Sequence, residues 1–232
     1  MTTTLAPPGG RATPLRSTVG RKQLMAVTGV LWFAFVFLHM VGMMKFFFGP
    51  ETFDHYSHWL RTLLTPLFPH GWFLWLQRTG LTVALLLHIF AATSLTLQSR
   101  RARPVRYAKT SNVQATYASR TMRWGGIIIV LFIVYHVMDL SIGPANPGFV
   151  RGEVFRNTVA SLEQWPVAAA YILSVGAVCM HLDHGVWSAL QTVGANRPKY
   201  DRAFKLLSRG VALLIFVGFS SVPVAILAGY RG

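Results

Sequence analysis

Five long apolar segments divide this chain, and their length constrains its fold more than any other feature of the sequence. They cover residues 24–48, 72–97, 124–142, 167–190 and 211–230. At about 1.5 Å of rise per residue, roughly 20 apolar residues cross a bilayer core of about 30 Å as an α-helix. Because a backbone amide in lipid has no water to bond, each segment must satisfy its own hydrogen bonds, and a helix does so. The sequence therefore predicts an all-α integral membrane protein with five transmembrane helices.

The charge content of the chain agrees with this prediction. Only 12% of the 232 residues are charged, whereas soluble domains carry about 25%. The net charge of +15 does not indicate a nucleic-acid partner, because the basic residues lie between the apolar segments and form no globular face. Residues 1–20 are rich in Pro, Gly and Thr and are predicted to be disordered. Residues 21–232 are then expected to form a single transmembrane domain.

Lys and Arg are divided unequally between the two sides of the predicted membrane domain. Sixteen of the 22 precede the first segment, or lie between the second and third or the fourth and fifth. Short basic loops stay in the cytoplasm. The distribution predicts an N-terminus inside, a C-terminus outside and a location in the cell inner membrane.

Histidines lie inside the first four apolar segments, and the fifth has none. His39, His88, His136 and His181 follow one another at spacings of 49, 48 and 45 residues. Helices one and three run outward, which puts His39 and His136 roughly 18–22 Å from the inner boundary, whereas His88 and His181 lie roughly 14 Å from it. Two histidines at equal depth on facing helices suit the two axial positions of a haem iron. The spacing predicts a di-haem four-helix core, with His39 and His136 at an outer haem b and His88 and His181 at an inner one.

A simpler interpretation is that some of these histidines only form hydrogen bonds between helices.

The position eleven residues before each histidine falls on nearly the same helical face, and these positions hold Thr28, Gln77, Gly125 and Ala170. Such small or polar neighbours suit a large flat ligand, but Gly and Ala also serve ordinary helix packing.

Two stretches of the sequence resemble the cytochrome b558 membrane-anchor subunit of succinate dehydrogenase/fumarate reductase, the single-chain five-helix di-haem type. They are residues 21–29, RKQLMAVTG, followed ten residues later by His39, and residues 181–192, HLDHGVWSALQT. The likeness extends over nearly the whole chain from about residue 17 and includes the histidine spacing. The stretch in the fourth segment is the more specific of the two.

The resemblance implies a function as well as a fold. It implies two haems b, a flavoprotein and an iron–sulfur subunit docked on the cytoplasmic face, and electron transfer between succinate and a quinone, menaquinone by expectation. Activity on succinate itself belongs to the soluble subunits. The family ligand on the fourth helix usually stands four residues before the glycine, which selects His181. In some relatives it stands directly before the glycine, which would select His184.

Further polar residues are candidates for binding the cofactor or the quinone. Haem propionates are anionic, so Arg78 is a candidate for the outer haem, and Arg21, Lys22, Arg123 and His184 for the inner one. The basic residues at segment ends also fit ordinary snorkelling to the interface. Asp139 follows His136 by three residues and could orient that ligand, take up protons for a quinone, or be a wetted carboxylate. An outer quinone site would use Asp139 and Arg78; an inner one would use Ser17, Ser188 and their neighbours.

Two other functions remain open at this level. One is a di-haem b subunit of a hydrogenase or formate dehydrogenase. The other is a proton-coupled transporter whose histidines form a relay, although such proteins often show internal repeats and helices broken in mid-membrane. The chain holds no nucleophile elbow, phosphate loop or CxxC motif, so redox chemistry here would belong to bound cofactors and partner subunits.

Overall fold

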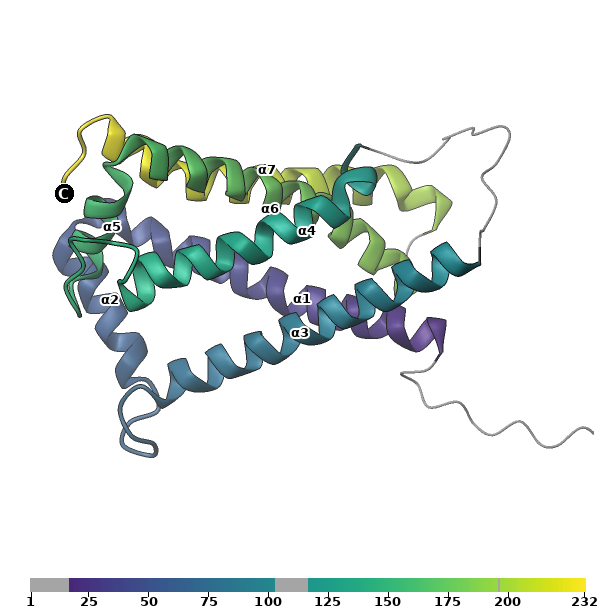
Figure 1. Cartoon of the computed structure of the whole chain (residues 1–232), viewed down its shortest axis with the longest axis horizontal. Helices are drawn as coiled ribbons and strands as arrows, with labels where there is room; N and C mark the ends of the chain where they lie inside the picture. The colour runs from purple at the N-terminus through teal and green to yellow at the C-terminus, as the bar shows by residue number, and fades with distance from the viewer. Residues whose placement is uncertain (1–16, 103–116, 196) are drawn as a thin grey trace, which may run out of the picture.

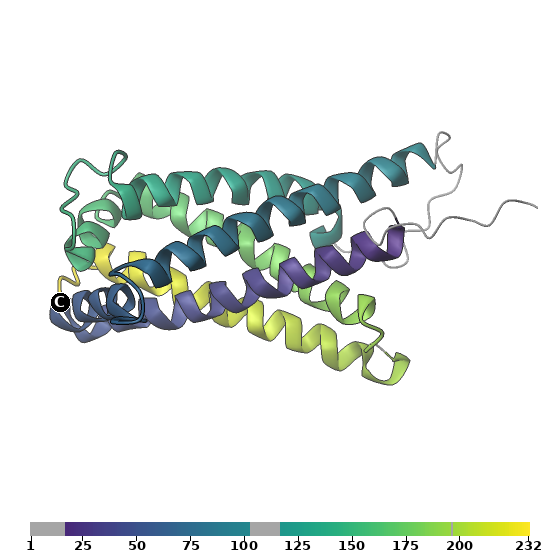
Figure 2. The same ribbon diagram turned by 90° about the horizontal axis from the view of Figure 1, so that it is seen from below.

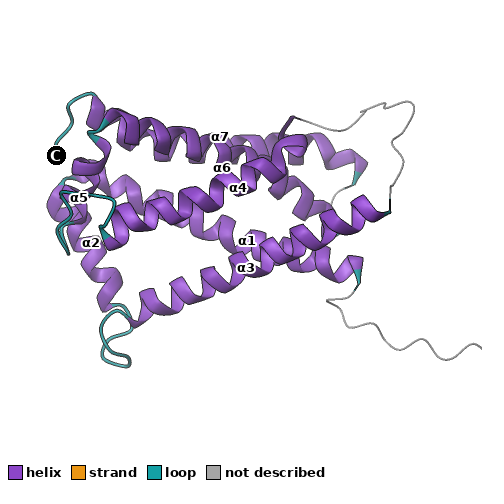
Figure 3. Ribbon diagram, viewed as in Figure 1, coloured by secondary structure: helices purple, strands orange, loops and turns teal. Residues whose placement is uncertain are grey.

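The computed structural model describes residues 17–102, 117–195 and 197–232, and its regular elements in these ranges are all helices (Figure 3). In chain order they are α1 (Thr18–Met43), the short helix η2 (Met44–Phe48), α2 (Pro50–Thr62), α3 (Trp72–Arg101), α4 (Tyr117–His136), η3 (Val137–Ile142), α5 (Val154–Leu162), α6 (Trp165–Thr192), η4 (Pro198–Tyr200) and α7 (Asp201–Leu227). Most of the predicted disordered stretch, residues 1–16, lies outside the described residues. Helix α1 begins inside that stretch, at Thr18, where the Ser17 hydroxyl accepts a hydrogen bond from the Gly20 N–H at 2.9 Å.

The described residues contain five helical segments that are long and apolar enough to cross a membrane, which confirms the predicted number. They are Thr18–Phe48, Trp72–Arg101, Met122–Ile142, Trp165–Thr192 and Pro198–Leu227. Large apolar side chains cover their outward faces, among them Leu38 with 65% and Leu173 with 76% of its surface exposed. Such faces suit lipid and not water. The chain is therefore a multi-pass membrane protein.

The helices extend beyond the apolar segments from which they were predicted. Helix α7 begins at Asp201, ten residues before the last apolar segment, because charged residues can continue a helix after it leaves the hydrocarbon. The same helix ends at Leu227 and not at residue 230 as predicted. Gly229 takes a left-handed conformation there, with φ of 99°, and the Tyr230 N–H bonds back to the Ala225 carbonyl at 2.9 Å.

The long helices lie side by side, with the start of α1 at one end of the bundle and the C-terminus at the other (Figures 1 and 2). Helix α6 packs against α1, α4 and α7, whereas α3 packs against α1 and the short α2. The end where α1 starts, here called the N-terminal end, also holds the last turn of α3 with Arg100 and Arg101 and the first turns of α7. The opposite end is called the C-terminal end.

Two short helices, α2 and α5, cover the C-terminal end and lie between the apolar segments predicted from the sequence (Figure 1). Helix α2 begins with Pro50 at its first position and Glu51 in its first turn, after Gly49 with φ of 89°. The Asp54 carboxylate of α2 accepts a hydrogen bond from the Phe155 N–H at 2.8 Å and so caps α5. Both helices are amphipathic and short, so a search for long apolar segments does not detect them.

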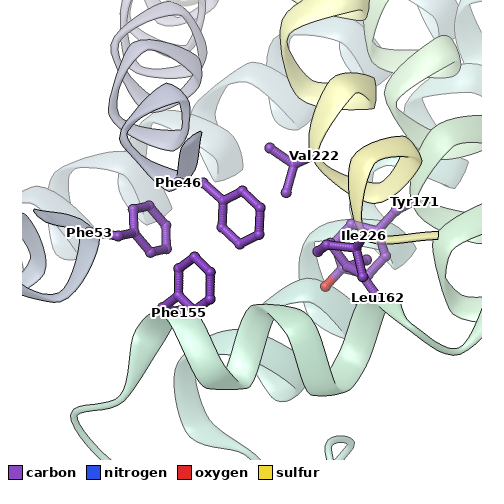
Figure 4. Close-up of a cluster of buried hydrophobic side chains, with 7 residues drawn as sticks. All are labelled: Phe46, Phe53, Phe155, Leu162, Tyr171, Val222 and Ile226. Atoms are coloured by element: carbon purple, nitrogen blue, oxygen red, sulfur yellow. The ribbon is translucent and has the colours of Figure 1, made fainter. Parts of the chain in front are cut away.

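An aromatic cluster ties these short helices to the long ones (Figure 4). Phe46 of η2 stacks on Phe155 of α5 with 4.6 Å between ring centroids, and Phe53 of α2 meets Phe46 edge to face at 6.0 Å. Val222 and Ile226 of α7 close the same cluster. Phe46 is completely buried.

Replacement of Phe46 by Ala is expected to destabilise the protein by about 3–5 kcal/mol, because it leaves a cavity among packed rings. Phe48→Ala is the matched control, since the Phe48 side chain is 74% exposed and its loss should change stability by less than about 0.5 kcal/mol. Unfolding of both purified variants in detergent, followed by circular dichroism, measures the difference. Equal midpoints for the two variants would contradict this account of the cluster.

Candidate functional site

A large cavity lies inside the bundle, with a volume of about 2600 Å³. Small-molecule sites usually occupy about 300–1,000 Å³, so this space is large enough for more than one ligand. Helices α1, α3, α4 and α6 contribute most of its lining, and η3, the last third of α7 and single residues of α2 and α5 contribute the rest. The lining is largely apolar, and all four histidines predicted as ligands belong to it.

His39 of α1 and His136 of α4 face each other toward the C-terminal end of the cavity. Their ring centroids are 5.9 Å apart, and the two ring planes are inclined by 73°. The Phe35 ring stacks on His39 at 5.4 Å, and Phe219 of α7 contacts it from another side at 5.6 Å. Tyr171 of α6 packs edge-on against His136 at 5.9 Å. Aromatic contacts therefore restrict the orientation of both imidazoles.

His88 of α3 and His181 of α6 form the second pair, nearer the N-terminal end. Their ring centroids are 6.2 Å apart. His184 also lines the cavity, but its ring contacts that of Trp187, with 6.1 Å between the ring centroids. Of the two histidines near the fourth-helix glycine, His181 is thus the one that faces His88.

The spacing within each pair fits two imidazoles on opposite faces of one metal ion. Metal–imidazole bonds of about 2 Å on both sides of an iron separate the ring centroids by roughly 6–6.5 Å. The observed separations of 5.9 and 6.2 Å lie close to this range. The residues paired in space are those paired by depth in the sequence. That they bind haem iron stays a prediction.

Several polar atoms around the cavity have no partner within the described protein. Trp32 Nε1, His136 Nδ1, His181 Nδ1 and Ser220 Oγ are buried and form no hydrogen bond to any described residue. All of these side chains line the cavity. Buried polar groups are nearly always hydrogen-bonded in native proteins, so orphan atoms gathered at one cavity are typical of a site that holds a ligand with polar groups of its own.

Cationic side chains lie at both ends of the cavity. Arg78 of α3 lines it near the C-terminal end, with its guanidinium 5.7 Å from the centre of the Trp75 ring. Arg100 and Arg123 line it at the opposite end, together with His184 and Ser188.

The candidates for cofactor or quinone binding at the start of α1 lie outside the cavity. Ser17, Arg21 and Lys22 do not contribute to the lining of the cavity, and Ser17 instead caps α1. Arg100 was used in the sequence analysis only to predict the orientation in the membrane, and its place in the cavity was not predicted. Its position in the last turn of α3, three turns beyond His88, is the signal that could have identified it.

Asp139 is buried in a polar network and is not the wetted carboxylate that one interpretation of the sequence expected. It has 1% of its surface exposed, and one of its oxygens accepts hydrogen bonds of 2.6 Å from the Ser161 and the Tyr171 hydroxyls. The α-helix becomes a π-helix, η3, directly after His136, and such a change in winding is frequent at functional sites. Asp139 does not line the cavity, whereas Tyr171 does. Tyr171 therefore connects the carboxylate to His136.

Polar contacts also fix the second half of α6 against α7. The Ser208 hydroxyl donates to the Asp183 carboxylate at 3.0 Å, and Trp187 Nε1 donates to the Asp201 carboxylate at 3.1 Å. Lys205 forms an ion pair with Asp201 at 2.7 Å. These contacts hold the turn that carries His181 and His184 in a fixed position.

We expect Asp139→Ala to destabilise the protein by about 2–5 kcal/mol, because it leaves two buried hydroxyls without an acceptor. Asp139→Asn keeps an acceptor oxygen at nearly the same place, so it should cost less than half as much. Thermal unfolding of the two variants in detergent checks the order. If both variants unfolded at the temperature of the unsubstituted protein, the network would not have the structural role inferred for it.

Comparison with known proteins gives no relative for this chain: no family model, curated protein or solved structure matches it.

Proposed function

We propose that this protein is a di-haem cytochrome b that carries electrons within the membrane. One observation supports this most directly: two pairs of histidines face each other across a single cavity, with ring separations of 5.9 and 6.2 Å. Trp32 Nε1 and Ser220 Oγ, two further atoms of the lining without a hydrogen-bond partner among the described residues, add a second argument for a ligand there. Bound haem b supplies reversible one-electron oxidation and reduction.

In this proposal the side chains of the protein bind the haems, orient the ligand imidazoles and shield the haems from water. His39 with His136, and His88 with His181, would hold the haem irons through neutral imidazole nitrogens. Phe35 and Phe219 hold the plane of His39. The apolar lining excludes water, and this affects the reduction potential of an enclosed redox centre.

The arginines that line the cavity would compensate the negative charge of the haems. Haem carries two propionate groups, and an anion placed in an apolar cavity needs a cation or hydrogen-bond donors beside it. Arg78 at one end and Arg100 and Arg123 at the other are the residues of the lining that provide this charge. Arg78 would neutralise the propionates of a haem held by His39 and His136, and Arg100 and Arg123 those of a haem held by His88 and His181.

We further propose that the partners are the flavoprotein and iron–sulfur subunits of succinate dehydrogenase. The support is the resemblance of residues 21–29 and 181–192 to the cytochrome b558 anchor, together with the basic character of the N-terminal end. Positive loops favour the cytoplasmic side, where those subunits would dock. Electrons would pass between them and a membrane quinone, by expectation menaquinone.

Both ends of the cavity offer groups for quinone binding. At the C-terminal end Arg78 and Tyr171 line the cavity, and the Tyr171 hydroxyl donates a hydrogen bond to Asp139 behind it. At the N-terminal end Ser188 and His184 line it. We favour the C-terminal end, because two haems in series are needed only if electrons travel to the far half of the membrane.

Haem stoichiometry in single-histidine variants tests the ligand assignment. His39→Ala or His136→Ala should remove one haem, and His88→Ala or His181→Ala the other, leaving one haem per chain in a pyridine haemochrome assay. His184→Ala should retain both. His70→Ala is the matched control, because His70 lies outside the lining of the cavity.

Two results would contradict the assignment. A wild-type protein without haem, purified from haem-replete cells, would reject the cytochrome altogether and favour the transporter hypothesis. Two haems in the His88→Ala variant would reject only the inner pair.

Reduction by succinate tests the proposed partners. The tagged chain, purified from its native membrane with mild detergent, should carry flavin and iron–sulfur absorbance, and added succinate should reduce its haem. Hydrogen or formate should have no effect. Haem reduction by formate or hydrogen with none by succinate would assign the cytochrome to a different dehydrogenase.

A further inference from the structure

Thr28 joins α1 to the histidine of α3 at the centre of the bundle. Its side chain is only 3% exposed. The hydroxyl oxygen lies 3.0 Å from His88 Nδ1, 2.8 Å from the Leu24 carbonyl oxygen and 3.2 Å from the Met25 carbonyl oxygen. A contact between helices and contacts within α1 therefore share one hydroxyl.

The number of protons available decides the direction of these hydrogen bonds. A threonine hydroxyl has one proton, and a carbonyl oxygen has none to give. The 2.8 Å contact with Leu24 is attractive only if Thr28 donates its proton there. The Thr28 oxygen can then only accept from His88, so Nδ1 of His88 carries the ring proton. The neutral imidazole consequently has its free lone pair on Nε2, which leaves that nitrogen available to a metal.

Helix α1 also passes close to the His88 ring at the next residue. A Cβ atom added to Gly29 would lie 3.4 Å from His88 Cε1, so α1 approaches the ring closely at this point. No comparable hydrogen bond supports its partner, because His181 Nδ1 has no acceptor among the described residues. The same is true of His136 Nδ1 in the other pair.

We propose that Thr28 is a positioning residue that fixes the tautomer and the orientation of His88 for metal binding. The proposal rests on the di-haem function proposed above. An imidazole that donates its second N–H to an acceptor is a more basic ligand, and a more basic ligand stabilises ferric over ferrous iron. Thr28 therefore strengthens haem binding at the inner site and lowers the reduction potential of that haem, while the outer haem is unaffected.

Three variants test this role. Thr28→Val has nearly the same shape without the hydroxyl, and Thr28→Ser keeps the hydroxyl. Thr158→Val is the matched control: Thr158 is 2% exposed and donates to the carbonyl four residues earlier, that of Val154, at 2.8 Å, as Thr28 does to Leu24. It lies in α5 and does not line the cavity.

Redox titration of the haem absorbance and haem content are measured for each purified variant. Thr28→Val should bind the inner haem roughly 10–100-fold more weakly and shift the potential of the inner haem that remains upward, with the outer potential unchanged. Thr28→Ser should behave as the unsubstituted protein, and Thr158→Val should change neither potential.

Two haems with unchanged potentials in Thr28→Val would overturn the proposal, and so would an equal shift in Thr158→Val. If Thr28→Val does not insert, Thr28→Ala and Thr28→Ser give the same comparison, and equal potentials in those two variants would overturn it. An unsubstituted protein without haem would instead reject the proposed function, so the two failures are distinguishable.

Discussion

A polar group inside a membrane protein has no water to bond, and this constraint governs both the scaffold and the site. In the backbone it requires helices, because each helix satisfies its own amides. In the side chains it explains why buried Asp139 receives two hydroxyl donors, from Ser161 and Tyr171. Four buried side-chain atoms have no hydrogen-bond partner among the described residues, and the side chains that carry them all line the same cavity.

Helices α1, α6 and α7 share a buried core cluster around Met40, Val175 and Ile215, to which α3 does not contribute. The Phe46 cluster joins α2, α5 and α7 at the C-terminal end, and the contacts of Asp183 and Asp201 join α6 to α7 at the other end. Helix α3, in contrast, packs mainly on α1 and α2. The Thr28–His88 contact is therefore part of what holds α3 in place as well as part of the site.

One face of α1 contributes a residue to each of the two histidine pairs. Thr28 and His39 are eleven residues apart, which returns to nearly the same helical face about 16 Å farther along the axis. The sequence placed Thr28 among the neighbours of His39, whereas the structure places it on His88 of the second pair. One face of one helix thus contributes a ligand candidate to one pair and a hydrogen bond to the other, which suits two redox centres stacked across a membrane.

The five apolar helices and the position of a histidine along each of four of them could be predicted from the chain's residues alone, because membrane thickness relates segment length and residue position to depth. The sequence also predicted which histidines share a depth. The contacts between helices could not be predicted in this way: His181 and not His184 faces His88, Arg100 lines the cavity while Arg21 does not, and Asp139 is enclosed by Ser161 and Tyr171. The tertiary structure also revealed α2 and α5. Depth depends on position along one helix, whereas these contacts depend on how each helix is rotated about its axis, and that rotation is set by packing between segments far apart in the chain.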